Sequence, residues 1–328
     1  MTGERHVDVL VVGAGPVGLY GAYCAGFRGL STALVDSLPE PGGQVAALYP
    51  EKSIYDIAGY PEVRGRDLIQ RLVEQASRFS PAYLLGQTAQ TLSRRIDGRF
   101  QVITSAGITV VASAVIVTGG IGTFTPRPLP AGTDFEGRGL CYFVPVLAEH
   151  AGQDVIIVGG GDSAFDWALS LHPLARSVTL VHRRETFRAH RYTVQKVRDL
   201  GIPIVTSSTV SALRGDGRLR EVDVTNVRSR ELQTLPADAV VAALGFTADL
   251  GPLESWGVKI ESRRILVDSR MSTTVPGVYA AGDITDYAGK IRLISVGFGE
   301  VATAVNNAAA RIDPGADLFP GHSTELAM

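Results

Sequence analysis

Two glycine-rich turns in the chain have the spacing of phosphate-binding loops. The first, Gly13-Ala14-Gly15-Pro16-Val17-Gly18, follows the β-branched run Val7–Val12 and precedes a helix-compatible stretch that ends near Gly29. A second apolar run, Ser31–Val35, ends at Asp36. A strand, a glycine turn, a helix and a second strand in this order predict a dinucleotide-binding unit.

Each position in this unit meets a separate physical demand. Gly13 permits the tight turn, Gly15 lets the backbone approach a pyrophosphate, and Gly18 lets the helix pack on the strand. Pro16 opens the helix, whose N-terminus attracts phosphate because its amide groups have no partners within the helix. Asp36 is placed to bind a ribose hydroxyl group. The alternative is an ordinary glycine-rich helix start that binds nothing.

The same order of elements recurs in the middle of the chain. The run Asp154–Val158 leads into Gly159-Gly160-Gly161-Asp162-Ser163-Ala164, a helix to about Leu171 and a further strand, Ser177–Val181. Alanine replaces the last glycine of the motif, and no acidic residue ends the second strand. The candidate nucleotide contacts here are Gly159, Gly161, Asp162, Ser163 and Ala164.

Basic residues follow that second strand in place of an acid. His182, Arg183 and Arg184 come directly after it, and Arg188 comes four residues later. Guanidinium groups bind phosphate bidentately, whereas a carboxylate here would repel a 2′-phosphate. The cluster therefore predicts a preference for NADP(H) over NAD(H), with a solvated basic turn as the alternative.

Two dinucleotide motifs in one chain allow one site to hold a flavin while the other holds nicotinamide. A flavin carries the hydride chemistry itself, and the protein supplies position and excludes side reactions. We therefore predict electron transfer between two bound nucleotides, and we expect no catalytic acid–base pair.

The composition favours a soluble protein of about two domains. The 328 residues include 31 basic and 33 acidic side chains, and a formal charge of −2 argues against nucleic-acid binding. Two cysteines, Cys24 and Cys141, indicate a reducing cytoplasm, and the six histidines form no zinc motif, so no metal is expected. The uncharged stretch Val9–Phe27 contains five glycines and Pro16, which predicts strand, turn and buried helix rather than a membrane anchor.

Further motifs carry a resemblance to a known family. Thr118-Gly119-Gly120 follows a predicted strand, and Val278–Asp283 (V-Y-A-A-G-D) lies near the end of the chain. With the two glycine motifs and the H-R-R-x-x-x-R run, these segments resemble the thioredoxin-reductase-like flavoproteins over almost the whole chain.

The resemblance implies an α/β fold of two Rossmann-like three-layer dinucleotide-binding domains. An NADPH domain at 121–246 is expected inside a discontinuous FAD domain at 1–120 and 247–328. Hinges are expected near 118–124 and 244–250, where glycines would permit rotation of one domain against the other.

One motif of the thioredoxin reductases is absent. Their C-x-x-C precedes the second fingerprint, but the matching segment here, Gly139–Val144, contains Cys141 alone. A single cysteine forms no internal dithiol relay, so electrons must leave the flavin directly. Cys141 and Cys24 are expected to be core residues.

Three more segments narrow the resemblance: Pro41-Gly42-Gly43-Gln44 with Ala47–Pro61, the run Gly297–Ala308, and the tail Gly321–Glu325. Together they are similar to the thioredoxin-reductase-like ferredoxin–NADP reductases. The FAD contacts that this similarity implies are Asp36, Gly43, Gln44, the backbone near Ala89, Phe124, Gly282, Asp283 and Thr324. It also implies that Tyr49 stacks on one face of the flavin and His322 on the other, in a homodimer whose tail covers a flavin.

The predicted reaction is hydride transfer from NADPH to FAD, followed by one-electron transfer to ferredoxin or flavodoxin in the cytoplasm. Arginines near the flavin are expected to guide such acidic carriers, and the candidates are Arg64, Arg66, Arg127 and Arg292. An NADPH-dependent reductase of a small disulfide or quinone is the alternative enzyme. A redox-sensing or electron-transfer scaffold that turns over slowly is the alternative from another class.

Overall fold

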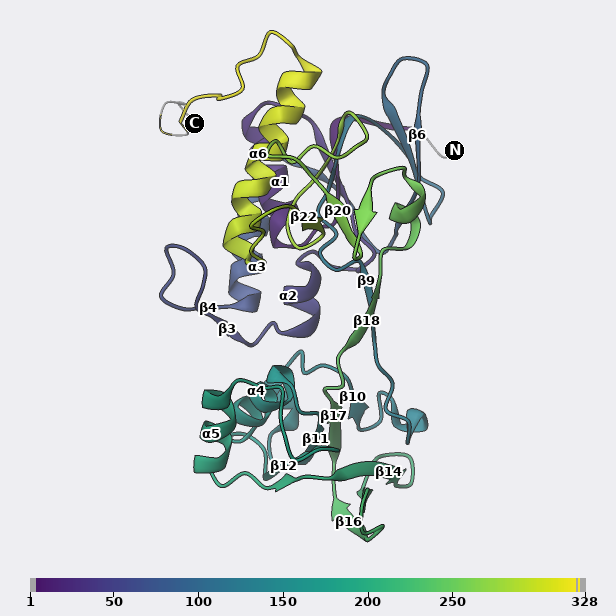
Figure 1. Ribbon diagram of the computed structural model, residues 1–328, viewed down its shortest axis with the longest axis vertical. Helices are drawn as coiled ribbons and strands as arrows, with labels where there is room; N and C mark the ends of the chain where they lie inside the picture. Colours follow the sequence, from purple (N-terminus) through teal and green to yellow (C-terminus); the bar gives the residue numbers. More distant parts are fainter. Residues whose placement is uncertain (1–3, 323, 325–328) are drawn as a thin grey trace. The chain divides into compact units, whose positions relative to one another are not determined.

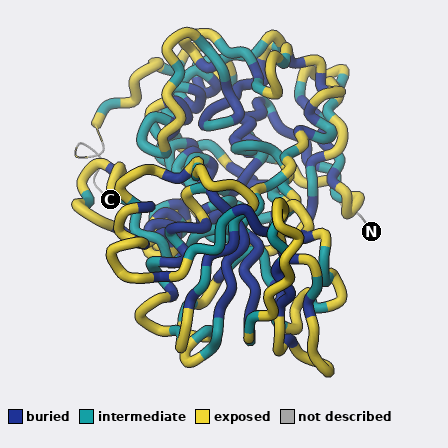
Figure 2. The backbone as a smooth tube through the Cα atoms, turned by 60° about the horizontal axis from the view of Figure 1, so that its bottom comes forward, coloured by how far each residue is buried: buried dark blue, intermediate teal, exposed yellow. Residues whose placement is uncertain are grey.

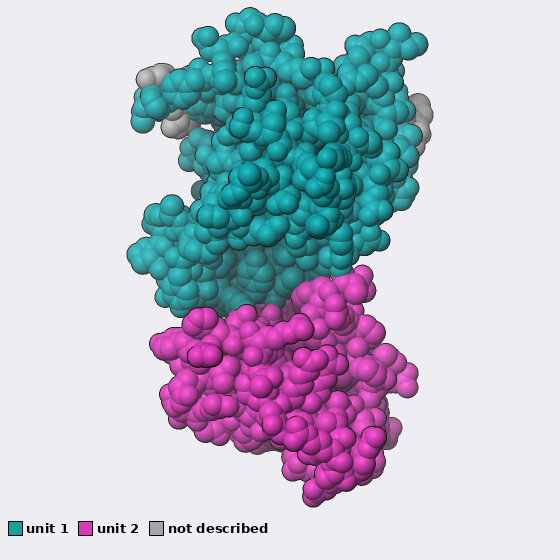
Figure 3. Space-filling view, viewed as in Figure 1, with its two compact units in different colours: residues 1–124, 248–328 teal, residues 125–247 magenta. Residues whose placement is uncertain are grey.

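The computed structural model describes residues 4–322 and Thr324. The chain divides into two compact units, of which unit 1 joins residues 1–124 to 248–328 and unit 2 is the continuous segment 125–247 (Figure 3). The division lies within four residues of the expected domain boundaries. Figure 1 shows the elements of each unit, and Figure 2 shows buried backbone inside each unit with exposed segments around it.

The main sheet of unit 1 is largely parallel, in the order β5-β2-β1-β8-β7-β6 with β21 also paired to β8. Its strands are β1 (Arg5–Val12), β2 (Thr32–Val35), β5 (Ala82–Leu84), β6 (Ala89–Arg94), β7 (Phe100–Thr104), β8 (Thr109–Val117) and β21 (Val278–Ala280). β1, β2, β5, β8 and β21 run parallel, whereas β6 and β7 form an antiparallel addition. Parallel strands need crossover connections, and the glycine turn after β1 begins the first of them.

Apolar side chains cover both faces of this sheet. Val9 and Val11 of β1 pack with the helices in one core cluster, while Leu10 between them packs in a second cluster with Trp256. The helices of unit 1 are α1 (Pro16–Phe27), α2 (Gly43–Leu48), α3 (Gly65–Ser77) and α6 (Ile294–Ile312). Smaller elements are β3 (Ser53–Ile54), β4 (Val63–Arg64), η3 (Gly251–Ser255), β19 (Ile260–Glu261), β20 (Arg264–Leu266) and β22 (Thr285–Asp286).

Unit 2 repeats the arrangement on a smaller scale. A parallel sheet in the order β10-β17-β11-β12-β13 has helices α4 (Asp162–Leu171) and α5 (Arg191–Asp199) packed in one core cluster. A three-stranded antiparallel sheet packs in a second core cluster of unit 2. The strands are β10 (Leu140–Cys141), β11 (Asp154–Val158), β12 (Ser177–Val181), β13 (Ile204–Val205), β14 (Ser208–Arg214), β15 (Glu221–Asn226), β16 (Leu232–Pro236) and β17 (Ala239–Ala242), with short helices η1 (Thr133–Phe135) and η2 (Leu147–His150). The expected three-layer, two-domain α/β fold is confirmed.

The two chain segments that join the units pair with each other. β9 (Thr123–Pro126) and β18 (Phe246–Asp249) form a two-stranded sheet, visible in Figure 1. The Arg127 amide donates to the Gly245 carbonyl at 3.0 Å. A Cβ on Gly122 would lie 2.1 Å from the Asp249 carbonyl oxygen, so the strands approach too closely there for another side chain. The expected hinge segments are thus short, paired strands.

Candidate functional site

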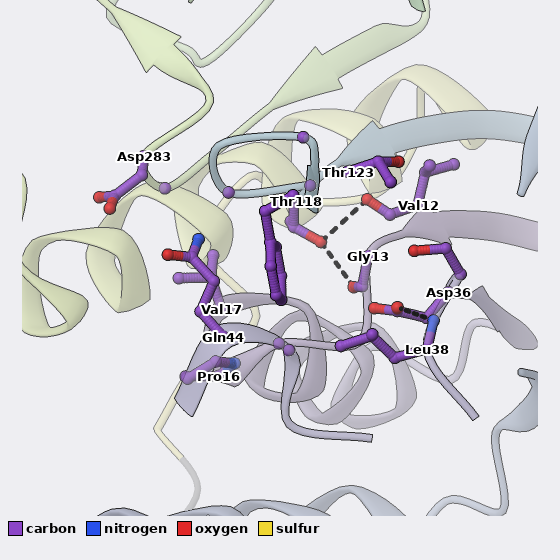
Figure 4. A pocket seen from close by; sticks show the side chains of 18 of the residues that line it. Val12, Gly13, Pro16, Val17, Asp36, Leu38, Gln44, Thr118, Thr123 and Asp283 are labelled. Carbon is purple, nitrogen blue, oxygen red and sulfur yellow. Dashed lines mark hydrogen bonds between the residues drawn. The ribbon is translucent and has the colours of Figure 1, made fainter. Parts of the chain in front are cut away.

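A pocket of unit 1 opens where the parallel strands end. Residues that directly follow β1, β2, β8 and β21 line it, which is the position where open α/β sheets bind ligands. Its lining includes eleven of the residues predicted to bind FAD: Gly13, Gly15, Pro16, Asp36, Gly43, Gln44, Tyr49, Ala89, Phe124, Gly282 and Asp283. In Figure 4 Asp283 and Gln44 lie at one end, Asp36 and Leu38 at the other, and Gly13 and Thr118 between them.

Backbone atoms form the middle of this pocket. Gly13 has a φ of +115°, and a Cβ there would lie 2.6 Å from the Thr118 carbonyl oxygen. The Thr118 hydroxyl donates to the Gly13 carbonyl at 2.8 Å, drawn as a dashed line in Figure 4. A Cβ on Gly43 would lie 2.9 Å from the Gly15 Cα, so α2 begins directly against the glycine turn. Glycine at these positions lets backbone amides approach an elongated phosphate ligand.

Gly18 acts behind the pocket rather than in its lining. A Cβ there would lie 1.8 Å from the Gly13 carbonyl oxygen and 2.8 Å from the Thr118 hydroxyl oxygen. Its absence allows α1 to pack against the turn, as its place in the motif predicts.

The Asp36 carboxylate is fixed by the backbone around it. It accepts hydrogen bonds from the Ala14 amide at 2.6 Å and from the Leu38 amide at 2.8 Å. Burial raises the pKa of Asp36, and these two bonds partly offset that effect. An ionised carboxylate has about four acceptor positions, so capacity remains for the hydroxyl groups of a ribose.

The other end of the pocket combines an aromatic ring with polar groups. Tyr49 lies there, and burial, followed by the charges of Asp283 and Asp56, raises its pKa to about 12. The side chain of Gln44 lies against Gly120, where a Cβ would be 2.7 Å from Nε2. An uncharged ring beside amide and carboxylate groups suits a flat heterocycle joined to a hydroxylated linker.

Sequence reasoning did not single out Gln87 or Glu300. Gln87 follows β5, lines the pocket, and its buried Oε1 has no hydrogen-bond partner, which leaves one acceptor for a ligand's N–H group. Its position after a parallel strand was the available signal. Glu300 lies within the quoted Gly297–Ala308 run, but only the structure places its carboxylate on the Gly282 amide.

The described tail does not line this pocket. Arg28 donates to the carbonyl oxygens of Asp317 at 2.8 Å and Leu318 at 3.4 Å. The His322 ring is exposed and packs edge-on against Phe319, with ring centroids 5.1 Å apart. Thr324 is also exposed. Neither His322 nor Thr324 is brought to the pocket of its own chain.

A second pocket lies wholly within unit 2. Its lining contains the predicted NADPH residues except Asp162 and Ala164. The lining residues from the two motifs are Gly159, Gly160, Gly161, Ser163, His182, Arg183, Arg184 and Arg188. No acidic side chain among the described residues forms an ion pair with the three arginines, so their charge is available to an anion.

The basic loop is tied to the glycine turn. The Arg188 amide donates to the Gly160 carbonyl at 2.8 Å, and the His190 amide donates to Asp162 Oδ1 at 2.8 Å. The Asp162 carboxylate therefore holds the loop against the turn. Ala164 is fully buried against Gly159, where a Cβ would be 2.9 Å from its methyl group.

His182 lies over the turn. A Cβ on Gly160 would be 2.2 Å from the imidazole ring. Burial lowers the pKa of His182 below its usual 6.5; a hydrogen bond with the Thr186 backbone partly opposes this, and the charges of Arg183 and Arg184 lower the pKa further. The ring is therefore predominantly neutral at pH 7.

The four candidate guiding arginines occupy different environments. Arg64 and Arg66 both pair with Glu51, and Arg292 lies 3.6 Å from Asp286. Arg127 lines the pocket of unit 2. The structure adds Arg264, whose guanidinium interacts with the charges of Arg292 and Asp283.

Both cysteines are weakly reactive. Burial raises the pKa of Cys24 and of Cys141 to about 12, so neither is a thiolate at neutral pH. Neither residue lines a pocket described above. Across residues 4–322 and Thr324, no group of three metal-binding side chains comes together, and no helix has the length and apolar character needed to cross a membrane.

Comparison with known proteins agrees with this geometry. The family model of the pyridine nucleotide-disulphide oxidoreductases matches residues 7–308. The chain is 61% identical over 322 residues to a ferredoxin–NADP reductase of Saccharopolyspora erythraea, with 98% of each chain covered. It is 49% identical over 328 residues to one of Thermus thermophilus, again with 98% of each covered.

Among solved structures, the chain is similar to the thioredoxin reductase of T. acidophilum. The TM-score is 0.77 at 27% identity, and the match covers 93% of this chain and 98% of that one. All these matches extend over nearly the whole sequence. The protein therefore belongs to the pyridine nucleotide-disulphide oxidoreductase family and, within it, to the thioredoxin-reductase-like ferredoxin–NADP reductases.

Proposed function

We propose that this protein is a ferredoxin–NADP reductase that binds FAD in unit 1 and NADPH in unit 2. The observation that carries the proposal is a pair of dinucleotide pockets in a chain whose two cysteines are free, half-buried and outside both pockets. FAD, when bound, accepts hydride from NADPH and passes the electrons on singly. The relatives named ferredoxin–NADP reductase support ferredoxin as the acceptor, and flavodoxin is a carrier of the same kind.

The residues of unit 1 fit FAD. Asp36 would offer acceptors to the ribose, the glycine turn would hold the pyrophosphate, and the unpaired oxygen of Gln87 would accept the adenine amino group. At the other end Tyr49 would stack on the flavin, and Asp283 would accept hydroxyl groups of the linker. Ile294, the first residue of α6, lines the pocket, so the positive end of the helix stabilises negative charge on the flavin.

The residues of unit 2 fit NADPH. Arg183, Arg184 and Arg188 would bind a 2′-phosphate, and Ser163 lies at the start of α4, whose amides would bind the pyrophosphate. Hydride transfer requires the nicotinamide to reach the flavin, so rotation on β9 and β18 is part of the proposal. A crosslink between the units is expected to lower turnover and leave FAD bound.

A homodimer is supported by the outer face of α1. Tyr20 stacks with Tyr23 and contacts Phe298 of α6, at centroid distances of 5.8 and 5.1 Å, and all three rings are partly exposed. A helix that is apolar on all sides normally has its outer face covered as well. In the proposed dimer His322 and Thr324 of one chain would reach the flavin of the other. The proposed location of the dimer is the cytoplasm.

The first test is NADPH-dependent cytochrome c reduction by the FAD-loaded protein, with and without ferredoxin. We expect a large ferredoxin-dependent gain that falls as ionic strength rises, because acidic carriers are attracted by arginines near the flavin. A small disulfide serves as the control substrate. Reduction of the disulfide without any gain from ferredoxin would replace the proposal with the thiol-reductase function. FAD binding without NADPH oxidation by any acceptor would favour a sensor.

A further inference from the structure

A buried carboxylate lies behind the turn that carries Asp283. Glu300, on α6, is 5% exposed. Its Oε2 accepts the Gly282 backbone amide at 2.7 Å, and its Oε1 accepts the Tyr287 hydroxyl at 2.5 Å. The same oxygen forms an ion pair with the ammonium group of Lys290. The side chain of Glu300 is 4% exposed and that of Lys290 is 2% exposed.

The contacts fix the conformation of Gly282. Its carbonyl accepts the Thr285 amide at 3.0 Å and the Thr285 hydroxyl at 2.8 Å, while Glu300 supplies the partner of its N–H group. Gly282 has a φ of +83°, and a Cβ there would lie 3.2 Å from Val17 on α1. Hydrogen bonds therefore hold both the N–H and the C=O group of Gly282, and these two groups set the direction in which the chain enters Asp283.

The network joins three segments around the flavin end of the pocket. Glu300 belongs to α6, Gly282 to the turn after β21, and Tyr287 and Lys290 to the loop between them, where the Lys290 amide donates to the Tyr287 carbonyl at 3.1 Å. Burial, followed by the hydrogen bond to Glu300, raises the pKa of Tyr287 to about 12, so its hydroxyl remains a donor. A buried carboxylate needs such partners because burial removes its water.

We propose that Glu300, neutralised by Lys290, is a positioning residue that holds Gly282 so that Asp283 meets the linker of FAD. The proposal rests on the FAD site argued above. On this proposal bound FAD requires the ordered turn, and the apoprotein tolerates a relaxed turn in which water replaces Glu300 as the partner of the Gly282 amide. Loss of the Glu300 hydrogen bond is therefore expected to reduce the free energy of FAD binding more than the free energy of apoprotein unfolding.

Two double variants test the hydrogen bonds of Glu300. Both E300Q/K290M and E300M/K290M lack the buried charges, but only glutamine keeps an oxygen for the Gly282 amide and a polar partner for the Tyr287 hydroxyl. Tyr287→Phe, which removes only the second of these bonds, is the control. A buried donor left without a partner costs about 1–3 kcal/mol, so we expect FAD to bind about tenfold more weakly to the methionine variant than to the glutamine variant. Titration of the apoproteins with FAD gives the affinities, urea unfolding gives apoprotein stability, and a redox titration gives the flavin potential.

Equal FAD affinity in the two variants would overturn the proposal. The proposal would also fail if the two variants differed as much in the free energy of apoprotein unfolding as in the free energy of FAD binding. The hydrogen bond would then stabilise the apoprotein and the FAD complex equally. We also expect the flavin potential to differ between the variants. Failure of the wild-type protein to bind FAD would instead overturn the proposed function.

Hydrogen exchange on the wild-type protein tests the same idea without substitutions. The amides of residues 282–290 are expected to exchange at least tenfold more slowly with FAD bound than without it, beyond any change in β1. Equal protection of this segment in both forms would mean that the turn is already rigid in the apoprotein, and the proposal would fail.

Discussion

His182 is the side chain of the unit 2 pocket whose charge changes nearest to neutral pH. Its lowered pKa means that the unfolded chain takes up a proton at higher pH than the folded protein. The histidine therefore costs no stability above pH 6.5, and its contribution becomes unfavourable as the pH falls through 6.5. A bound 2′-phosphate reverses this preference because it attracts the imidazolium.

We predict that NMR titration of His182 gives a pKa below 6.5 in the free protein and a higher value with NADP+ bound. NAD+, which lacks the 2′-phosphate but keeps the pyrophosphate, is the matched control and is expected to raise the pKa less. An equal upward shift with both nucleotides would show that the phosphate does not face His182.

Arg188 gives a second prediction at this scale. A hydrogen bond between charged partners contributes about 1.5–3 kcal/mol, so Arg188→Ala is expected to weaken NADPH binding about 10- to 100-fold. NADH binding is expected to change less than about threefold, since no phosphate contact is lost. The ratio of kcat/KM for the two nucleotides measures the effect, and Arg198→Ala, outside the pocket lining, serves as the control. Equal losses for NADPH and NADH would contradict the assignment.

At the scale of elements, two helical glycines test how closely the helices pack. Gly18 of α1 is in close contact with the glycine turn, whereas Gly299 of α6 has open space around it. Gly18→Ala forces a methyl group onto the Gly13 carbonyl and is expected to cost more than about 3 kcal/mol of stability and to prevent FAD binding. Gly299→Ala, in α6, meets open space and is expected to stabilise the protein by about 0.5–1 kcal/mol. Thermal unfolding and flavin content measure both. A Gly18→Ala protein that retains FAD would refute the close approach of helix and turn.

Many helices and strands could be predicted from the sequence, because residue types and glycine positions within a short segment determine them. The strands Asp154–Val158 and Ser177–Val181 were expected with the bounds that the structure has. The position of the glycines and short runs rich in β-branched and apolar residues are sufficient to predict such strands. The Glu300 contact could not be predicted, because it joins residues 18 positions apart through tertiary packing. The bond between the Asp162 carboxylate and the basic loop could not be predicted either, because it joins residues 28 positions apart, and the nucleotide contact expected of Asp162 stays a prediction.

At the scale of the whole molecule, unit 2 is one continuous segment with its own core clusters. A fragment of residues 125–247 is therefore expected to fold alone, with cooperative urea unfolding and measurable NADP+ binding. A fragment of residues 1–247 is expected to show the same single transition and to bind no FAD. FAD binding by the longer fragment would show that β21 and α6 are dispensable.

The interruption of unit 1 by unit 2 also sets the order of events during synthesis. Unit 2 is complete before the 81 residues 248–328 of unit 1 are added, and these include β21, Asp283 and α6. At 5–20 residues per second, the interval lasts about 4–16 s. During that time β8 lacks its β21 partner, so the exposed strand edge requires protection from aggregation. Cofactor loading is consequently a late step of biogenesis, and flavin supply acts on a chain whose nicotinamide domain is already folded.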